Sequence, residues 1–165
     1  MTITFDIRTE YWTDMRTPLG KLRLVADNRG LNRIDFTENI RPSAGNCVET
    51  KILQQTKREL LEYFRGERTE FDVPLHPDGT PFQISVWNEL LKIPYGMTTT
   101  YGEIARNLGN PEAMRAVGAA NGRNPINIII PCHRVVGTNG KLIGYGGGID
   151  RKLWLLKHEA AEILI

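Results

Sequence analysis

The sequence has few of the features that mark secreted, membrane-spanning or zinc-binding proteins. Only two cysteines, Cys47 and Cys132, occur in 165 residues, and a chain of this length buries a core without a disulfide, so we expect both thiols to be reduced. No second cysteine or histidine pair follows at zinc-ligand spacing, so no metal is expected. No stretch approaches the roughly 20 apolar residues of a membrane span, and the first residues do not resemble a signal peptide. These absences predict a cytoplasmic protein without membrane association.

The net charge is also low, at +2 from 21 Lys and Arg against 19 Asp and Glu. The excess is unevenly placed, because residues 82–165 carry 9 basic and 6 acidic residues whereas residues 1–81 carry 12 and 13. A basic half attracts an anionic partner such as DNA, since neutralised phosphates release counterions. A solvated basic surface explains the same distribution, so charge alone leaves both interpretations open.

The first half of the chain has the pattern of a small sheet followed by a helix. Three segments rich in aromatic and β-branched residues, separated by glycine and proline turns, predict antiparallel strands. They are residues 9–17, 21–27 and 31–37. An apolar pattern at helical spacing then runs from Ile52 to Phe64 and ends at Gly66, which predicts a helix packed on that sheet.

A proline-rich connection divides the chain. Residues 74–81 contain three prolines, a composition typical of a link between two packed units. We therefore predict an N-terminal domain of residues 1–78 and a C-terminal domain of residues 79–165.

Short helices are predicted beyond that connection. Thr80 followed by Pro81 is a typical helix cap and first turn. Two more helices are predicted over residues 101–108 and 111–121, at a spacing that fits a DNA-binding helix-turn-helix but also a helix pair inside a globular core. The second of these is built of small residues with Arg115 as its one cation. That composition suits tight helix packing as well as close approach to a DNA groove.

The residues with the clearest chemistry surround Cys132. Three consecutive isoleucines lead into Pro131, which has no N–H to donate, so regular structure must break there. A thiolate is the reactive form of cysteine, and His133 can act as its base. Neighbouring side chains of a strand point apart, so this pairing requires a turn or helix start at Cys132. A small buried cysteine without chemistry fits the same residues.

The glycine-dense segment after Cys132 and the last helix add two further candidates. Residues 137–148 match neither the Walker nor the dinucleotide pattern, but their glycines and Tyr145 suit a flat ligand in close approach. A long surface hairpin has the same composition. A last helix is predicted over residues 151–164, and it carries Glu159, which either orients a histidine or faces solvent.

These segments together resemble the O6-alkylguanine-DNA alkyltransferase family. The resemblance rests on the signature Ile130-Pro-Cys-His-Arg-Val135 and on four accompanying motifs. They are Asn124-Pro125, Arg115-Ala-Val-Gly118, Gly144-Tyr-Gly-Gly147, and Trp154-Leu-Leu with His158-Glu159. The match covers residues 79–165, and in the first half it rests on Thr17-Pro-Leu-Gly20 and on the order of strands and helix.

The resemblance implies both a fold and a reaction. The fold is a small α/β, RNase H-like N-terminal domain with an antiparallel sheet and a helix, packed on a helical C-terminal domain of winged-helix or helix-turn-helix type. The reaction is DNA repair by direct reversal, in which the alkyl group of O6-alkylguanine, and of O4-alkylthymine, in double-stranded DNA passes to Cys132 in a single turnover. No cofactor is implied, and the protein is expected to be a monomer, with cooperative binding along DNA left open.

The resemblance also implies a role for individual residues. Cys132 accepts the alkyl group, His133 deprotonates it through a water with support from Glu159, Asn124 braces the turn, and Tyr101 rotates the target phosphate and donates to the base. Arg115 fills the space of the flipped nucleotide as its helix enters the minor groove. The other implied DNA contacts are Ala116, Ala119, Asn121, Gly122 and Arg123. The implied guanine pocket is lined by Val135, Tyr145, Gly146 and Gly147.

One departure and two rivals follow from the same residues. Gly146 stands where some family members carry a hydroxyl residue, which leaves room for bulkier adducts. A non-repairing DNA-binding relative would lack the acceptor cysteine, whereas a cysteine hydrolase using Cys132 and His133 would turn over many substrates. The repair interpretation requires the Cys132 sulfur to line an open pocket and to be partly ionised by its histidine neighbour.

Overall fold

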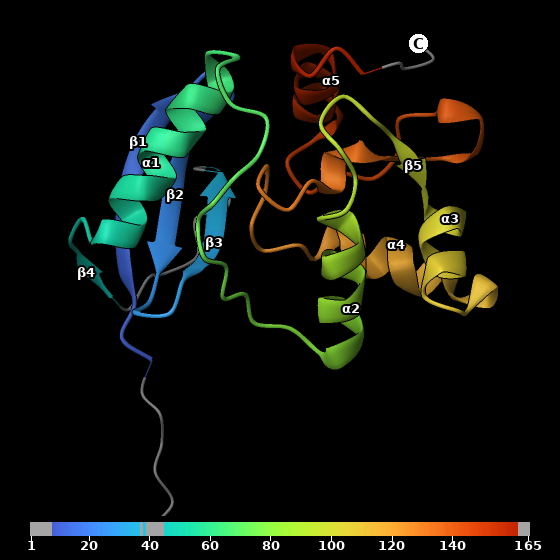
Figure 1. The fold of residues 1–165 in the computed structure, drawn as a ribbon, viewed down its shortest axis with the longest axis horizontal. Coiled ribbons are helices and arrows are strands. Elements are labelled where there is room, and N and C mark those ends of the chain that lie inside the picture. Colours follow the sequence, from blue (N-terminus) through green and yellow to red (C-terminus); the bar gives the residue numbers. More distant parts are fainter. Residues whose placement is uncertain (1–7, 37, 39–44, 162–165) are drawn as a thin grey trace, which may run out of the picture.

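The N-terminal half of the protein is a four-stranded sheet covered by one helix. The computed structural model describes residues 8–36, 38 and 45–161 (Figure 1). The strands β1 (Tyr11–Thr17), β2 (Gly20–Ala26) and β3 (Leu31–Phe36) form an antiparallel meander. The two-residue β4 (Asn46–Cys47) pairs in parallel with β1, which gives the order β3-β2-β1-β4. The three predicted strands are thus confirmed over their described residues, but the sheet is mixed rather than purely antiparallel.

Helix α1 (Lys51–Phe64) packs on this sheet as its apolar spacing predicts. The Thr50 side chain caps the helix by accepting from the Leu53 backbone N–H. Its buried face includes Leu53, Leu60 and Tyr63, all with no exposed surface. The helix therefore places a tyrosine in the interior close to its C-terminal end.

The C-terminal half consists of short helices around two very short strands. Its elements in chain order are α2 (Pro81–Leu90), β5 (Thr99–Thr100), α3 (Tyr101–Asn107), η2 (Pro111–Ala113), α4 (Met114–Gly122), η3 (Cys132–Arg134), β6 (Val135–Val136), η4 (Thr138–Gly140) and α5 (Ile149–His158). Thr80 and Thr100 each form a capping box with the glutamine or glutamate three residues later. The predicted last helix is shorter than expected, because Ala160 adopts a φ of 52° beyond its end, and residues 162–165 lie outside the described part.

The predicted helix pair is present as α3 and α4. Gly109, with a φ of 77°, makes the turn between them, and the short η2 leads into α4. The Trp87 indole N–H of α2 donates to the Ala120 carbonyl of α4 at 2.9 Å. Helix α4 is therefore held from behind by α2 and α3, which leaves its other side free.

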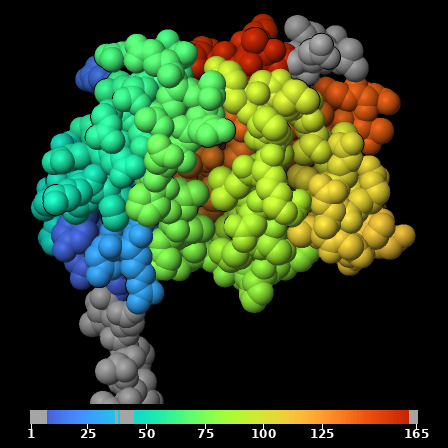
Figure 2. Space-filling view, in the orientation of Figure 1, coloured from blue at the N-terminus to red at the C-terminus, as the bar shows by residue number. Residues whose placement is uncertain are grey.

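Strand β3 joins the two halves. The Leu31 N–H donates to the Pro74 carbonyl at 2.8 Å, and the Ile34 N–H donates to the Pro125 carbonyl at 2.9 Å. The Asn127 side-chain amide returns a bond to the Ile34 carbonyl at 3.0 Å. Figure 2 shows the connection between the halves, in green, lying along their boundary. The edge of the sheet thus positions the segment that leads to Cys132.

None of the described helices is both long and apolar enough to cross a membrane. The longest, α1, has 14 residues, well below the roughly 20 that span a bilayer.

Replacing Ile126 with alanine tests the joint between the halves. Ile126 is fully buried and pairs with Ile34 across the joint, so we expect a loss of about 2–5 kcal/mol in the free energy of unfolding. Leu91→Ala is the matched control, because Leu91 is 45% exposed and should cost no more than about 0.5 kcal/mol. Urea unfolding of both variants measures the difference, and equal losses would contradict the proposed importance of the joint.

Candidate active site

The turn before Cys132 is closed by one asparagine side chain. The Asn124 amide N–H donates to the Ile130 carbonyl at 2.8 Å, and its side-chain oxygen accepts from the Ile126 N–H at 3.0 Å. Within this turn Ile128 has a φ of 76°, a strained conformation for a β-branched residue. Asn124 therefore bonds to both ends of the turn that contains this strained residue, which is the geometry that a bracing role requires.

Cys132 begins a single helical turn, η3. Pro131 precedes the turn, and the Arg134 N–H donates to the Pro131 carbonyl at 3.0 Å. Regular structure breaks at Pro131 as predicted, and Cys132 lies at the helix start that its pairing with His133 requires. The three isoleucines form a tight core segment, in which Ile128 and Ile130 are buried.

A buried carboxylate organises the residues behind the sulfur. Glu159 Oε1 accepts from His133 Nε2 at 2.8 Å and from Arg134 Nη2 at 3.0 Å, and Oε2 accepts from Arg134 Nε at 2.9 Å. The Tyr63 hydroxyl of α1 donates to the same Oε1 at 2.7 Å. Although burial opposes ionisation, the bonds from His133 and Arg134 hold the pKa of Glu159 well below its usual range. Glu159 therefore orients His133, and its solvent-facing alternative is excluded.

His133 has one ring nitrogen bonded and one without a protein partner. Because Nε2 donates to Glu159, Nδ1 is left to accept, and Nδ1 is buried without a partner among the described residues. Burial lowers the pKa of His133 below its ordinary value, against the opposing effect of Glu159. A neutral histidine with a free acceptor nitrogen is the form that a general base requires.

The repair interpretation was expected to require an open, partly ionised thiol at Cys132, and this structure contradicts that requirement. The Cys132 side chain is buried, with 2% of its surface exposed. Burial raises the pKa of the thiol to about 11, and hydrogen bonding from Asn124 and the charge of Lys152 only partly oppose this. The sulfur is therefore a neutral thiol at neutral pH, and a base must remove its proton before it attacks.

Two tyrosines lie close to the sulfur. The Tyr101 hydroxyl donates to the Ile143 carbonyl at 3.2 Å, and the Tyr145 hydroxyl is buried without a partner among the described residues. Burial raises the pKa of both hydroxyls, and the negative charge of an ionised Cys132 raises both further. Both tyrosines thus remain neutral hydrogen-bond donors beside the sulfur.

A groove runs along the outer side of Tyr101. Its volume is about 610 Å³, within the range of about 300–1,000 Å³ found for ligand pockets. Helices α3 and α4 form one wall and the segment after β6 forms the other. The wall residues central to the argument are Tyr101, Arg115, Gly118, Ile143 and Gly144. Cys132 is not part of the wall, so the groove stops short of the sulfur.

The free side of α4 carries most of the predicted DNA contacts. Arg115, Ala116, Ala119, Gly122 and Arg123 are exposed. Asn121 is different, because its side chain is 2% exposed and belongs to the interior. The prediction of Asn121 as a DNA contact is therefore wrong for this structure.

The predicted base pocket divides between the core and the loop. Val135 is fully buried in β6, while Gly146 and Gly147 lie in the loop near Tyr145. The loop contacts the N-terminal half: a side-chain carbon at Gly147 would lie 2.5 Å from the Phe36 ring. Only glycine fits at position 147 without moving that ring.

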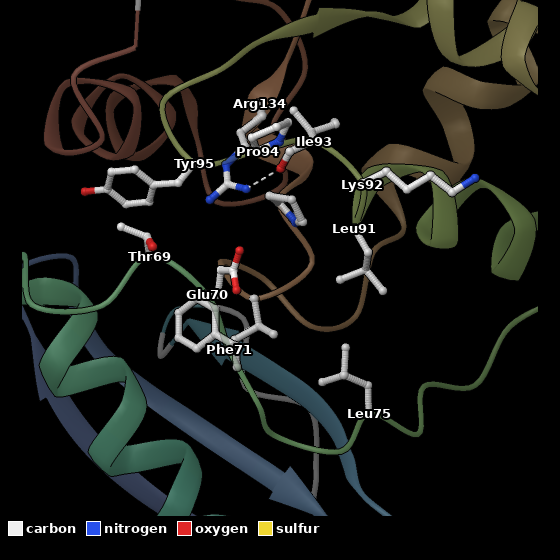
Figure 3. Close-up of a pocket in the computed structure, with 12 residues that line it drawn as sticks. Thr69, Glu70, Phe71, Leu75, Leu91, Lys92, Ile93, Pro94, Tyr95 and Arg134 are labelled. Atoms are coloured by element: carbon white, nitrogen blue, oxygen red, sulfur yellow. Dashed lines mark hydrogen bonds between the residues drawn. The ribbon is translucent and has the colours of Figure 1, made fainter.

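A second hollow borders the active-site turn. It has a volume of about 600 Å³ and is lined by Phe71 and Leu75 from the first half and by Tyr95, Pro131 and Arg134 from the second. Figure 3 shows Arg134 at its edge, where Nη1 donates to the Ile93 carbonyl at 2.6 Å. The lining includes none of the residues predicted to act on the substrate.

Comparisons with known proteins cover almost the whole chain. Residues 81–161 match the family described as 6-O-methylguanine DNA methyltransferase, DNA binding domain, and residues 11–77 match its ribonuclease-like domain. The chain belongs to the 6-O-methylguanine DNA methyltransferase family. Its fold is accordingly the ribonuclease-like domain joined to the DNA-binding domain that the sequence resemblance implied, and DNA is its partner.

Individual relatives support the same family assignment. Methylated-DNA–protein-cysteine methyltransferase of Methanosarcina acetivorans is 50% identical over 92% of this chain and 99% of its own, and that of Mycobacterium bovis is 63% identical over 92% and 93%. The crystal structure of Mycobacterium tuberculosis OGT in complex with DNA superposes with a TM-score of 0.85, 47% identity and coverage of 91% and 92%. The chain is thus a methyltransferase of DNA repair whose acceptor is a cysteine.

Three residues of the methyltransferase site were not assigned from the sequence. Arg134 and Tyr63 bind Glu159, and Lys152 is fully buried with Nζ donating to the carbonyls of Val135, Ile143 and Gly144 at 2.5, 2.8 and 3.4 Å. Burial lowers the pKa of Lys152 to about 8. Its helical spacing from Leu155, Leu156 and Glu159 was a signal that it faces inward.

The two thiols of the methyltransferase predict a reactivity difference. Both are free, with Cys47 exposed and Cys132 buried. Iodoacetamide at neutral pH should label Cys132 at least about tenfold more slowly than Cys47, because its pKa of about 11 keeps it protonated. The labelling rate of Cys132 should rise as pH approaches that value, and mass spectrometry follows both sites. Equal labelling of the folded protein would refute the buried neutral thiol, while equal labelling in urea is the control.

No group of three metal-binding side chains of the histidine, cysteine and carboxylate types gathers within the described ranges.

Proposed function

We propose that Cys132 is the alkyl acceptor and that His133, oriented by Glu159, is its base. The Cys132 sulfur attacks the alkyl carbon, the S–C bond forms as the bond from carbon to the guanine oxygen breaks, and the electron pair leaves on guanine. The thiol proton passes through a water to His133 Nδ1 and is returned to the leaving guanine. The observation that carries this proposal is the pairing of Nε2 with Glu159 beside an unpartnered buried Nδ1.

Because the Cys132 thiol is neutral, the base must remove its proton. With a pKa of about 11, Cys132 supplies little thiolate on its own at neutral pH. Proton removal must therefore accompany substrate entry, when the base and the thiol act together. Tyr101 and Tyr145 remain protonated near the sulfur, and we propose that the Tyr101 hydroxyl donates a hydrogen bond to the departing guanine while the proton from His133 returns to it.

The exposed face of α4 suits entry into the minor groove of duplex DNA carrying alkylated guanine. Small side chains at Ala116, Ala119 and Gly122 permit close approach to the DNA backbone. Arg115 extends from the same helix into the wall of the groove in front of Tyr101. We propose that it fills the space left by the flipped nucleotide, which costs a few kcal/mol to unstack. Arg123 and Tyr101 would contact the adjacent phosphates.

The flipped base must open a path to the sulfur. The groove in front of Tyr101 leads toward the loop that holds Gly144, Tyr145, Gly146 and Gly147, and Val135 lies beneath it. The Tyr101 hydroxyl bonds to the Ile143 carbonyl in this wall, and we propose that this contact closes the path in the free protein. Entry of guanine, or of O4-alkylthymine, therefore requires this contact to separate, and binding energy from DNA can drive the movement.

The proposed reaction consumes the protein. A thioether is a poor leaving group, so the alkylated Cys132 is not regenerated and each chain performs one transfer. All atoms of the transfer come from substrate and thiol, so the step requires no cofactor. We further propose that the protein acts as a monomer in the cytoplasm, with cooperative assembly along DNA as a separate question for binding experiments.

The stoichiometry of labelling tests the proposal and separates it from a cysteine hydrolase. Incubation with DNA carrying O6-methylguanine should add one methyl group per chain, located at Cys132 by peptide mass spectrometry, with no release on longer incubation. Cys132→Ala should add none while still binding the DNA, and Cys47→Ala is the matched control that should react normally. Continued turnover, or methyl transfer to another residue, would reject Cys132 as the single-use acceptor.

Gly146 predicts a substrate preference. A side-chain carbon at position 146 would lie 3.6 Å from the Gly122 carbonyl, an ordinary contact, so Gly146→Ala and Gly146→Ser should both fold. Filling this space should lower the rate for benzylated relative to methylated guanine by about tenfold, the effect of a small group in an apolar pocket. Competition between the two substrates measures the ratio. An unchanged ratio in both variants would show that position 146 does not limit the size of the adduct.

A further inference from the structure

Tyr63 brings the N-terminal domain into direct contact with the proposed catalytic relay. It lies near the end of α1 and has no exposed surface. Its hydroxyl donates to Glu159 Oε1 at 2.7 Å across 96 residues of sequence. Glu159 must be the acceptor in this bond, because its carboxylate stays ionised while burial and the neighbouring charge keep the Tyr63 hydroxyl protonated.

The Tyr63 ring is fixed independently of this bond. Its centroid lies 5.4 Å from the rings of Phe64 and Phe71, 6.1 Å from Tyr95 and 5.0 Å from His158. These contacts hold the ring in place. The hydroxyl therefore arrives at Glu159 from a rigid support, and removing it leaves the packing of the ring intact.

One carboxylate oxygen is shared between Tyr63 and the base. Glu159 Oε1 accepts from Tyr63 at 2.7 Å, from His133 Nε2 at 2.8 Å and from Arg134 Nη2 at 3.0 Å. Each donor withdraws part of the negative charge that the other donors feel. Tyr63 thus limits how strongly Glu159 attracts a proton on His133.

We propose that Tyr63 is a positioning residue for alkyl transfer: its hydroxyl fixes the Glu159 carboxylate on His133 and moderates the basicity of that pair. The proposal rests on the proposed role of His133 as the base. It gives the N-terminal domain a part in the chemistry, beyond its packing against the DNA-binding domain. The ionisable groups around this pair are Tyr63, Tyr95, Cys132, Arg134, Tyr145 and Lys152, and His158 packs on the Tyr63 ring.

Tyr63→Phe is the direct test, and Tyr95→Phe is the matched control. Tyr95 belongs to the same aromatic cluster, but its hydroxyl donates to the His158 backbone carbonyl at 3.3 Å instead of to Glu159. The rate of alkyl transfer from O6-benzylguanine to Cys132 is measured from about pH 5 to about pH 9, which spans the titration of a histidine. DNA affinity and thermal unfolding are measured on the same variants.

Loss of the Tyr63 hydroxyl should move the pH profile. With one donor fewer, Glu159 attracts the His133 proton more strongly, so the pKa of His133 rises and the acidic fall in rate shifts up by about one pH unit. Below the new pKa the base is protonated and transfer should slow by about three- to tenfold at slightly acidic pH. DNA affinity should be unchanged. Tyr95→Phe should keep the wild-type profile.

A purely structural role gives a different result. If Tyr63→Phe lowers the unfolding temperature but leaves the pH profile in place, the proposal is overturned. A second measurement uses Glu159→Gln with and without Tyr63→Phe. Since Tyr63 acts through Glu159, its hydroxyl should make no further difference to the rate in the Gln background, and a full additional loss there also overturns the proposal.

The same set distinguishes failure of the underlying function. If Glu159→Gln does not slow transfer in any background, His133 is not the base and the proposed function fails at that point. If Glu159→Gln slows transfer while Tyr63→Phe leaves rate and pH profile unchanged, the relay stands and Tyr63 has no part in it.

Discussion

The site depends on the hydrogen bonds and ion pairs that compensate the buried negative charge of Glu159. An ionised carboxylate in a protein interior is costly unless charged or polar partners surround it. Here His133 and Arg134 come from the turn that holds Cys132, and Tyr63 comes from α1 of the other domain. Arg134 also binds the Ile93 carbonyl. Satisfying this one carboxylate therefore fixes the positions of four segments, and the base acquires its orientation as a consequence.

A second constraint acts on the front of the same turn. Strand β3 bonds to Pro125 and Asn127, and Asn124 closes the turn around the strained Ile128. The sulfur thus lies on a short segment held by the sheet edge on one side and by Glu159 on the other. The N-terminal domain supplies part of both supports. Its contacts explain why a repair methyltransferase keeps a ribonuclease-like domain that carries none of the proposed reacting atoms.

The local features of the site could be predicted from the sequence, whereas its long-range contacts could not. Pro131 predicted the break in regular structure at Cys132, and short patterns such as Thr80-Pro81 predicted where capped helices begin. Tyr63 has the same apolar pattern as any buried helix residue, and nothing local indicates a partner 96 residues away. A lysine such as Lys152 normally extends to solvent, so its burial depends on backbone carbonyls that only the folded loop presents.

Two errors have specific causes. Asn121 was assigned to the DNA face from the family resemblance, but in α4 it lies one helical turn after Val117 and shares the buried side of the helix with Val117 and Ala120. The open thiol was inferred from the break in regular structure at Pro131, and its partial ionisation from the neighbouring His133. The neighbouring positions of Cys132 and His133 in the sequence indicate which groups can act together. The exposure of the sulfur depends on Tyr101, Tyr145 and the loop packed above them, and a local sequence pattern does not reveal that packing.

A buried, protonated thiol also protects the sulfur of a protein that can use it only once. An exposed thiolate would react with any alkylating or oxidising agent in its surroundings, and each such reaction would inactivate one protein molecule. At Cys132 burial raises the pKa to about 11, so in the proposed mechanism reactivity depends on His133 and on opening of the path to the sulfur. In that mechanism, both requirements are met when DNA presents a flipped base. Binding energy from DNA then activates the sulfur only toward the flipped alkylated base.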